Sequence, residues 1–332
     1  MKLLRVLLLL VGLGFLVALV LENDPAAVFD SVTRLSWRLL VILAFPMFLV
    51  MALDALGWRY AFLHDRVPFA PLLATRLAGE AFNIVTPTAA LGGEVVKAWL
   101  LRDRVPLEES VPSVIIAKTT ITMAQGIFLL LGVALAVVTL GGSRLLLAME
   151  WLVALEVIAL ALFILMQTRG LVGWGARLLD RLGIRRMSAS GTAARVDAAL
   201  ADFYRRKPRR LALSILFHLA AWLLGILETW LILWFLGIPV SLATATVIEA
   251  FGTGIRFATF LIPGSLGAQE GGYMMTFVAL GLTGADGVTF GLVRRFRELV
   301  WVGIGLALFA AMRRGPVAGL ADPILPRKNP GG

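Results

Sequence analysis

The chain of 332 residues contains no cysteine and two histidines, and charged residues make up 16% of it. The absence of cysteine excludes disulfide bridges, thiolate metal sites and cysteine nucleophiles. Two histidines without an HExxH pattern do not supply the ligands of a typical catalytic zinc site. The stretch 264–267 is not a GxSxG elbow, and 92–94 lacks the Lys-Ser/Thr of a P-loop. We therefore expect neither an enzyme nor a metal or other cofactor.

Apolar residues dominate what is present: 59% of the chain is hydrophobic, and its mean hydropathy is +0.89. Long apolar runs recur along the chain, and a helix that crosses a bilayer needs about 20 such residues. This composition predicts an all-α integral membrane protein that forms a single membrane domain over 1–332. The net charge of +10 is typical of basic cytoplasmic loops that touch anionic headgroups, so nucleic acid is not expected as a partner.

Six apolar runs are long enough to cross the membrane. They cover about 3–21, 39–56, 111–140, 147–166, 211–236 and 288–312. Lys2 and Arg5 precede the first run, and the loop at 167–210 holds 11 basic residues against three acidic ones. Because positive loops remain inside, both termini and this loop are expected on the cytoplasmic side of an inner, or plasma, membrane. The sequence leaves the oligomeric state open.

The basic loop has a helical pattern of its own. Trp174, Leu178 and Leu182 recur every four residues, and so do Arg177, Arg181 and Arg185. This pattern predicts an amphipathic helix that lies on the inner membrane face and binds anionic lipid headgroups. A solvated basic loop is the alternative.

Two further regions are apolar but broken. The segments 72–85 and 93–101 are helical in pattern but too short to span, and a Gly- and Pro-containing stretch at 86–92 separates them. The region 241–282 has the same character, with Pro263-Gly264 in its middle. Broken apolar segments of this kind predict two re-entrant helical hairpins, because irregular backbone inside a membrane must line protein or a cavity.

The two broken regions share their spacing. In each, a proline precedes a glutamate by seven residues, and a cation follows that glutamate by 24 residues. The first set is Pro87, Glu94 and Lys118, and the second is Pro263, Glu270 and Arg294. One region follows a cytoplasmic loop and the other an outer loop, so the units 72–140 and 241–312 should be inverted repeats. A chance match between Gly/Pro-rich turns is the alternative.

The broken regions carry many polar groups for a membrane interior. A charge in hydrocarbon costs several kcal/mol unless it is paired or hydrated. We therefore predict a charge-balanced cavity between the hairpins, near mid-membrane, with Glu94 near Lys118 and Glu270 near Arg294. The candidate substrate-binding residues are Glu80, Asn83, Pro87, Gly92, Gly93, Glu94, Lys118, Glu249, Arg256, Pro263, Gly264, Gly267, Gln269, Glu270, Arg294, Arg297 and Glu298. Alternatively, these charges pair with each other and lock the bundle.

Three stretches carry a family resemblance. They are Gly79-Glu80-Ala81-Phe82-Asn83, Pro87 with Gly92-Gly93-Glu94-Val95-Val96-Lys97, and Pro263-Gly264-Ser265-Leu266-Gly267-Ala268-Gln269-Glu270-Gly271-Gly272. Over about residues 5–312 the chain resembles the lysylphosphatidylglycerol synthase transmembrane region, also called the flippase-like domain family. The third stretch, with Arg294-Arg295-Phe296-Arg297-Glu298 behind it, looks closest to the hopanoid-associated branch. The resemblance implies lipid flipping. Lipid aminoacylation is not implied, because the chain has no room for the soluble transferase domain.

The leading functional hypothesis is a flippase or transporter that moves an amphipathic lipid, with an anionic or polar headgroup, across the bacterial cytoplasmic membrane. The second hypothesis is a membrane-embedded enzyme of lipid or polyprenyl-phosphate metabolism, which alone should change a lipid chemically in detergent. The third is a small-solute or ion-coupled transporter, which alone should move a water-soluble tracer without competition from lipid.

Overall fold

The computed structural model describes residues 21, 35–64, 67–86, 92–140, 144–168 and 192–313, and all the regular structure in these residues is helical. The helices are α3 (Arg38–Tyr60), α4 (Phe69–Val85), α5 (Gly92–Leu101), α6 (Leu107–Leu140), α7 (Arg144–Thr168), α9 (Thr192–Arg206), α10 (Pro208–Phe235), α11 (Leu242–Ala258), the 3-10 turn η1 (Pro263–Ser265), α12 (Ala268–Ala279) and α13 (Gly284–Arg313). The predicted amphipathic helix at 174–185 lies outside the described residues, as does the predicted first span apart from residue 21.

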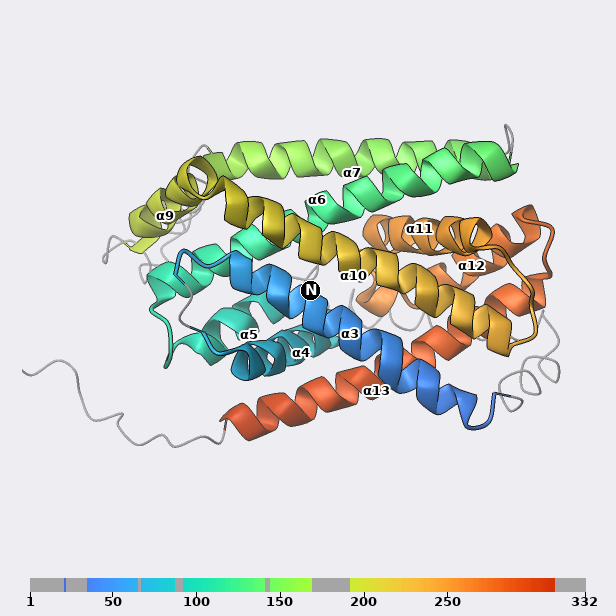
Figure 1. Ribbon diagram of the computed structural model, residues 1–332, viewed down its shortest axis with the longest axis horizontal. Helices are drawn as coiled ribbons and strands as arrows, with labels where there is room; N and C mark the ends of the chain where they lie inside the picture. The colour runs from blue at the N-terminus through green and yellow to red at the C-terminus, as the bar shows by residue number, and fades with distance from the viewer. Residues whose placement is uncertain are drawn as a thin grey trace, which may run out of the picture.

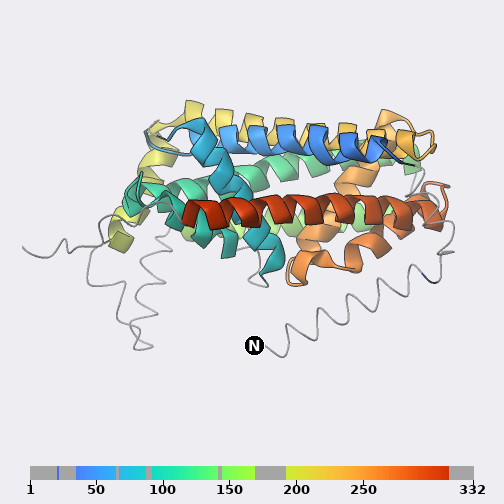
Figure 2. The ribbon, with the colours of Figure 1, turned by 90° about the horizontal axis from the view of Figure 1, so that it is seen from below.

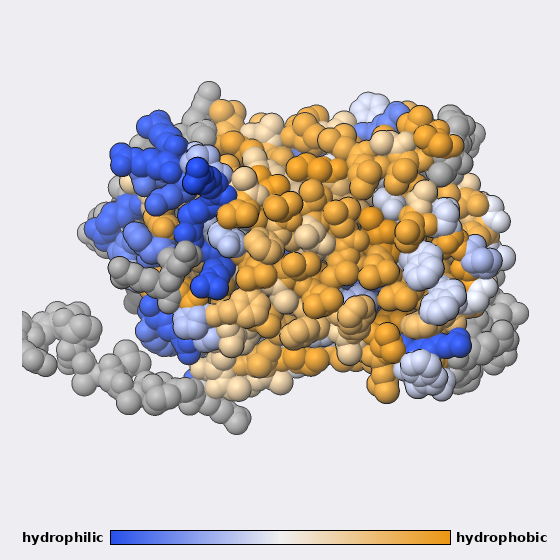
Figure 3. Space-filling view, in the orientation of Figure 1, coloured by the Kyte–Doolittle hydropathy of each residue, from blue (hydrophilic) through white to orange (hydrophobic). Residues whose placement is uncertain are grey.

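Four of the described helices are long and apolar enough to cross a membrane, namely α3, α6, α7 and α10. α13 has 30 residues, which is ample length at 1.5 Å per residue, although arginines and a glutamate interrupt its first half. The space-filling view shows hydrophilic side chains gathered at the end formed by α9 and a broad apolar band beside it (Figure 3). The predicted helical membrane protein is therefore confirmed.

Each hairpin consists of two short helices. α4 and α5 have 17 and 10 residues, and α11 and α12 have 17 and 12 residues. The shorter helix of each pair is about 15–18 Å long at 1.5 Å per residue, well below the roughly 30 Å of a bilayer core. In Figure 1 the first hairpin occupies the half of the bundle nearer α9 and the second hairpin occupies the other half. The hairpins thus enter from opposite ends.

The packing between the two halves is reciprocal. α3 and α10 lie side by side and antiparallel (Figures 1 and 2), with Tyr60 stacked on Phe217, and Ile42 in one core cluster with Ile232. α4 packs against α13, and α11 packs against α6. Each hairpin therefore packs on the long helix that follows the other hairpin. A pseudo-two-fold axis between α3 and α10 would relate the two halves and produce this reciprocal packing. The packing therefore supports the inverted repeat that the sequence predicts.

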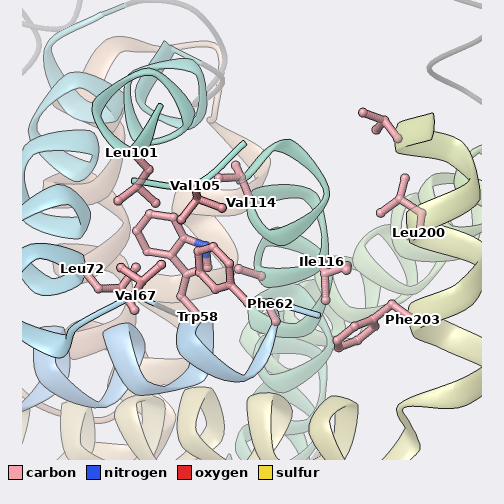
Figure 4. Packing of buried hydrophobic residues seen from close by; sticks show 13 residues of the cluster. Trp58, Phe62, Val67, Leu72, Leu101, Val105, Val114, Ile116, Leu200 and Phe203 are labelled. Carbon is pink, nitrogen blue, oxygen red and sulfur yellow. The ribbon is translucent and has the colours of Figure 1, made fainter. Parts of the chain in front are cut away.

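A hydrophobic cluster holds the end of the bundle near α9. Trp58 and Phe62, at the end of α3 and just after it, pack with Leu101, Ile116 and Phe203, as Figure 4 shows. The Nε1 of Trp58 donates a hydrogen bond to Ser113 at 3.2 Å. This cluster joins the base of the first hairpin to α3, α6 and α9, and so fixes the end from which that hairpin enters.

The close approach of α13 to α4 depends on a glycine. A Cβ added at Gly305 would collide with the carbonyl oxygen of Leu77 and the Cβ of Ala81, whereas a Cβ at Gly303 would meet nothing within 4 Å. We therefore expect Gly305→Ala to lower the free energy of unfolding by about 1–3 kcal/mol. Gly303→Ala, on the same helix, should be neutral or stabilise the protein by up to about 1 kcal/mol. Unfolding midpoints in detergent measure both, and equal midpoints would contradict the packing.

Candidate functional site

A cavity of about 340 Å³ lies between the two hairpins. Its wall takes residues from α3, α4, α5, α6, α10, α11, α12 and α13, together with η1. The hairpin tips meet beside it, since α4 contacts η1 and a Cβ at Gly264 would lie 3.8 Å from Ile84. The structure therefore has a cavity where the sequence predicted one.

The described charges of the cavity balance. Six carboxylates line it, from Asp54, Glu80, Glu94, Glu228, Glu249 and Glu298. Six cations face them, from Arg76, Lys97, Lys118, Arg256, Arg294 and Arg297. Low-dielectric surroundings tolerate such charges when they are paired and hydrogen-bonded.

In the first hairpin, Asn83 and Lys97 hold Glu94. The Oδ1 of Asn83 accepts a hydrogen bond from the Gly93 amide at 2.8 Å, and its Nδ2 donates to Glu94 at 3.1 Å. The Nζ of Lys97 lies 2.9 Å from a carboxylate oxygen of Glu94. Gly93 has no side chain to obstruct this arrangement, and a Cβ there would collide with the backbone oxygen of Gly79. The broken segment thus presents an ordered carboxylate to the cavity.

On α4 of the same hairpin, Arg76 forms an ion pair that joins α4 to α3. Its Nη2 lies 2.7 Å from Asp54 and 3.9 Å from Glu80, one turn along α4. The other oxygen of Asp54 lies 2.7 Å from Nδ1 of the buried His218. Asp54 and His218 are not among the predicted site residues, although a lone aspartate in an apolar run indicates a polar site.

On the side of the second hairpin, two arginines of α13 form ion pairs with glutamates of α11 and α10. Arg294 forms a bidentate ion pair with Glu249, with one N–O distance of 3.0 Å. Thr229 also donates to Glu249, at 2.6 Å. Arg297 pairs with Glu228. Glu228 stands out in the sequence as the lone charge in its apolar run, but the predicted site left it out.

The tip of the second hairpin is attached to α13 by a chain of ionic contacts. Arg256 donates to Glu298 and to Gln269, each at 2.8 Å. Arg295 contacts Glu298, donates to the carbonyl of Gly264 at 2.8 Å, and lies 2.8 Å from Glu270. These contacts fix the turn between α11 and α12 against the long helix.

The prediction that Glu270 lines the cavity beside Arg294 is wrong. Glu270 pairs with Arg295 and accepts a hydrogen bond from the Gly267 amide at 2.8 Å, and it is not among the residues that line the cavity. Successive residues of a helix point about 100° apart. Arg294 and Arg295 therefore face different neighbours, and spacing along the sequence gave the wrong one.

Glu94 and Lys118 interact electrostatically, as their predicted proximity requires, but they do not form a direct ion pair. Both residues line the cavity, but the carboxylate of Glu94 is bound by Lys97, one turn along its own helix. Among the described residues, no carboxylate lies within ion-pair distance of Lys118. Thr122 and Gln125 follow Lys118 along α6 at four and seven residues, and both line the cavity.

The predicted site residues divide into three groups according to their positions in the structure. Those that line the cavity are Glu80, Asn83, Glu94, Lys118, Glu249, Arg256, Gly264, Gln269, Arg294, Arg297 and Glu298. Gly92, Gly93, Pro263, Gly267 and Glu270 belong to the hairpin turns or helix starts and do not line it. Gly264 and Gly267 have φ of 59° and 76°, which glycine adopts most readily. Pro87 lies outside the described residues.

These features define a multi-pass helical membrane protein in which two broken hairpins enclose a charged cavity. The chain belongs to the lysylphosphatidylglycerol synthase transmembrane-region family, whose sequence model matches residues 3–306. It is 24% identical over 288 residues to a UPF0104 membrane protein of Methanothermobacter thermautotrophicus, and the match covers 80% of this chain and 82% of that relative. No solved structure matches the chain. The closer likeness to the hopanoid-associated branch stays a prediction.

Proposed function

We propose that the protein moves an amphipathic lipid with an anionic headgroup across the cytoplasmic membrane and leaves the lipid chemically unchanged. The observation that carries this proposal is the ammonium group of Lys118 in the cavity. Five of the six cavity cations have a carboxylate within ion-pair distance, at 2.9 Å or less. Lys118 has none among the described residues, so its charge is available to a phosphate or carboxylate of a ligand.

The cavity wall also suits the rest of a lipid. Met47, Val50 and Met51 on α3, with Phe257 on α11, add apolar surface beside the charged groups. At the tip of the second hairpin Phe260 lines the cavity, and its exposed fraction is 53%. An acyl or prenyl tail can therefore remain against apolar surface while its headgroup enters the polar part, which favours a lipid over a water-soluble substrate.

Mass spectrometry of the protein released from detergent micelles tests the proposal directly. We expect an anionic phospholipid to co-purify with the wild-type chain, and Lys118→Gln to reduce its occupancy. The bound lipid should also keep its mass during prolonged incubation, because transport leaves it unchanged. Binding that is confined to neutral lipids, or steady chemical conversion of the bound lipid, would contradict the proposal.

The orientation in the membrane is part of the same proposal. The end formed by α9 carries Arg205, Arg206 and Arg209, and the positive-inside rule favours the cytoplasmic side for it. Because the chain has no cysteine, single-cysteine labelling reports the side of each end. Arg206→Cys should react only with a reagent that enters the cell, whereas Pro239→Cys, in the loop between α10 and α11, should react from outside. The reverse labelling would contradict this orientation.

A further inference from the structure

Glu156 differs from every other buried carboxylate that the structure describes. It lies in the middle of α7, and its exposed fraction is 1%. The other buried carboxylates are Asp54, Glu228, Glu249, Glu270 and Glu298, and each is within ion-pair distance of an arginine. Glu156 has no cation at that distance among the described residues. Its Oε1 has no hydrogen-bond partner in the described part of the chain, and its Oε2 accepts a 3.4 Å hydrogen bond from Gln125.

Among the residues that the structure describes, the helices around Glu156 present no compensating charge. Facing it, α6 offers the neutral Gln125, and Lys118 lies seven residues away along that helix. On α11, Glu249 and Arg256 are bound to residues of α13. α9 meets α7 at the end of the bundle, as Figure 1 shows, and its charged residues are Arg195, Asp197, Asp202, Arg205 and Arg206. On α7 itself, Glu150 is exposed six residues away.

Such surroundings favour the neutral acid. An ionised carboxylate in an apolar site without a cation is strongly disfavoured, so the group takes up a proton while it is enclosed. A connection to the cavity exists, because Gln125 both bonds to Glu156 and lines the cavity wall. A carboxyl group that is neutral when enclosed and can ionise when cavity water reaches it is suited to carry a proton.

We propose that Glu156 is a proton-binding site that couples lipid movement to the proton gradient. In the enclosed state the carboxylic acid holds the proton. When the cavity opens to one side, water beyond Gln125 receives the proton, and the carboxylate binds another proton from the side with the higher proton concentration. This inference rests on the proposed function, because it supplies the energy for the lipid step. Intramembrane carboxylates commonly act in proton relays.

The test uses the full chain in phosphatidylcholine vesicles that contain a trace of fluorescent phosphatidylglycerol. Dithionite bleaches the probe in the outer leaflet and so reports its distribution. A gradient of about two pH units can sustain up to a ~100-fold leaflet ratio at one proton per lipid, since each 1.4 kcal/mol is tenfold. We expect the wild-type protein to shift the probe toward one leaflet when the gradient is applied. The Glu156→Gln variant should still move the probe between leaflets, but the final distribution should be the same with and without the gradient.

One matched control variant and a second readout complete the experiment. Glu150→Gln removes a carboxylate from the same helix and should keep the response to the gradient. The infrared carbonyl band of a protonated carboxylic acid should be present at neutral pH in the wild-type protein and in Glu150→Gln, and absent from Glu156→Gln. If the band persists in Glu156→Gln, or if wild-type transport does not respond to the gradient, Glu156 does not couple transport to protons. Either result would leave the proposed lipid transport itself intact. An absence of lipid movement under all conditions would overturn the proposed function as well.

Discussion

Replacing Arg294 by glutamine is expected to destabilise the protein by about 3–5 kcal/mol, because breaking a buried ion pair leaves an uncompensated charge. The side chains of Arg294 and Glu249 are 14% and 4% exposed, and the pair joins α13 to α11 in the wall of the cavity. The loss should appear as a lower unfolding midpoint in detergent. The same variant should also transport poorly, because the pair helps to shape the site.

A double variant separates charge imbalance from loss of packing. Glu249→Gln combined with Arg294→Gln removes both charges, so it should recover most of the stability that the single change loses. The exposed pair of Arg206 with Asp202, at 78% and 43% exposure, is the control, and Arg206→Gln should cost at most about 1 kcal/mol. If the single Arg294 variant unfolds like the wild type, the buried pair does not hold the two helices together.

Replacing Lys118 by glutamine is expected to slow lipid transport by about 10- to 100-fold, since a hydrogen bond to a charged group contributes about 1.5–3 kcal/mol. The change should leave stability within about 1 kcal/mol of the wild type, because no described carboxylate loses an ion-pair partner. Retained stability therefore distinguishes this variant from the Arg294 variant, which should lose both stability and transport.

Two further replacements of Lys118 separate the effect of its charge from the effect of its length. Lys118→Arg keeps the positive charge and should retain most of the transport, whereas Lys118→Met keeps the length without charge and should behave like the glutamine variant. Transport rates are measured with the fluorescent phosphatidylglycerol probe at equal protein density. Full activity of the methionine variant would remove Lys118 from the binding site.

Much of the fold could be predicted from the sequence, because its signals are local. Length and hydropathy define each span, and the Gly- and Pro-containing breaks near 86–92 and 263–267 mark the turns of the hairpins. α5 begins at Gly92, next to the predicted start at 93, and α12 begins at Ala268, just after the predicted break at Pro263-Gly264. The equal spacings in the two halves predicted an inverted repeat, which the reciprocal packing of the hairpins supports.

The ionic partners could not be predicted in the same way. Partner choice depends on which face of a helix a residue occupies, and a shift of one residue rotates the side chain by about 100°. Glu270 therefore meets Arg295 instead of Arg294. Lys97 binds Glu94 because it lies one turn away on the same helix, a contact that overrides the longer spacing to Lys118. The Asp54–His218 contact depends on how α3 packs against α10, which no local pattern encodes.

Reconstituted vesicles show whether the purified chain moves an anionic lipid between leaflets. Vesicles with the wild-type protein, with Lys118→Gln, and without protein are compared for dithionite-accessible fluorescent phosphatidylglycerol. We predict that the probe in the wild-type vesicles exchanges between leaflets well above the protein-free rate, and that Lys118→Gln removes most of this increase. Exchange in the wild-type vesicles at the protein-free rate would contradict the claim.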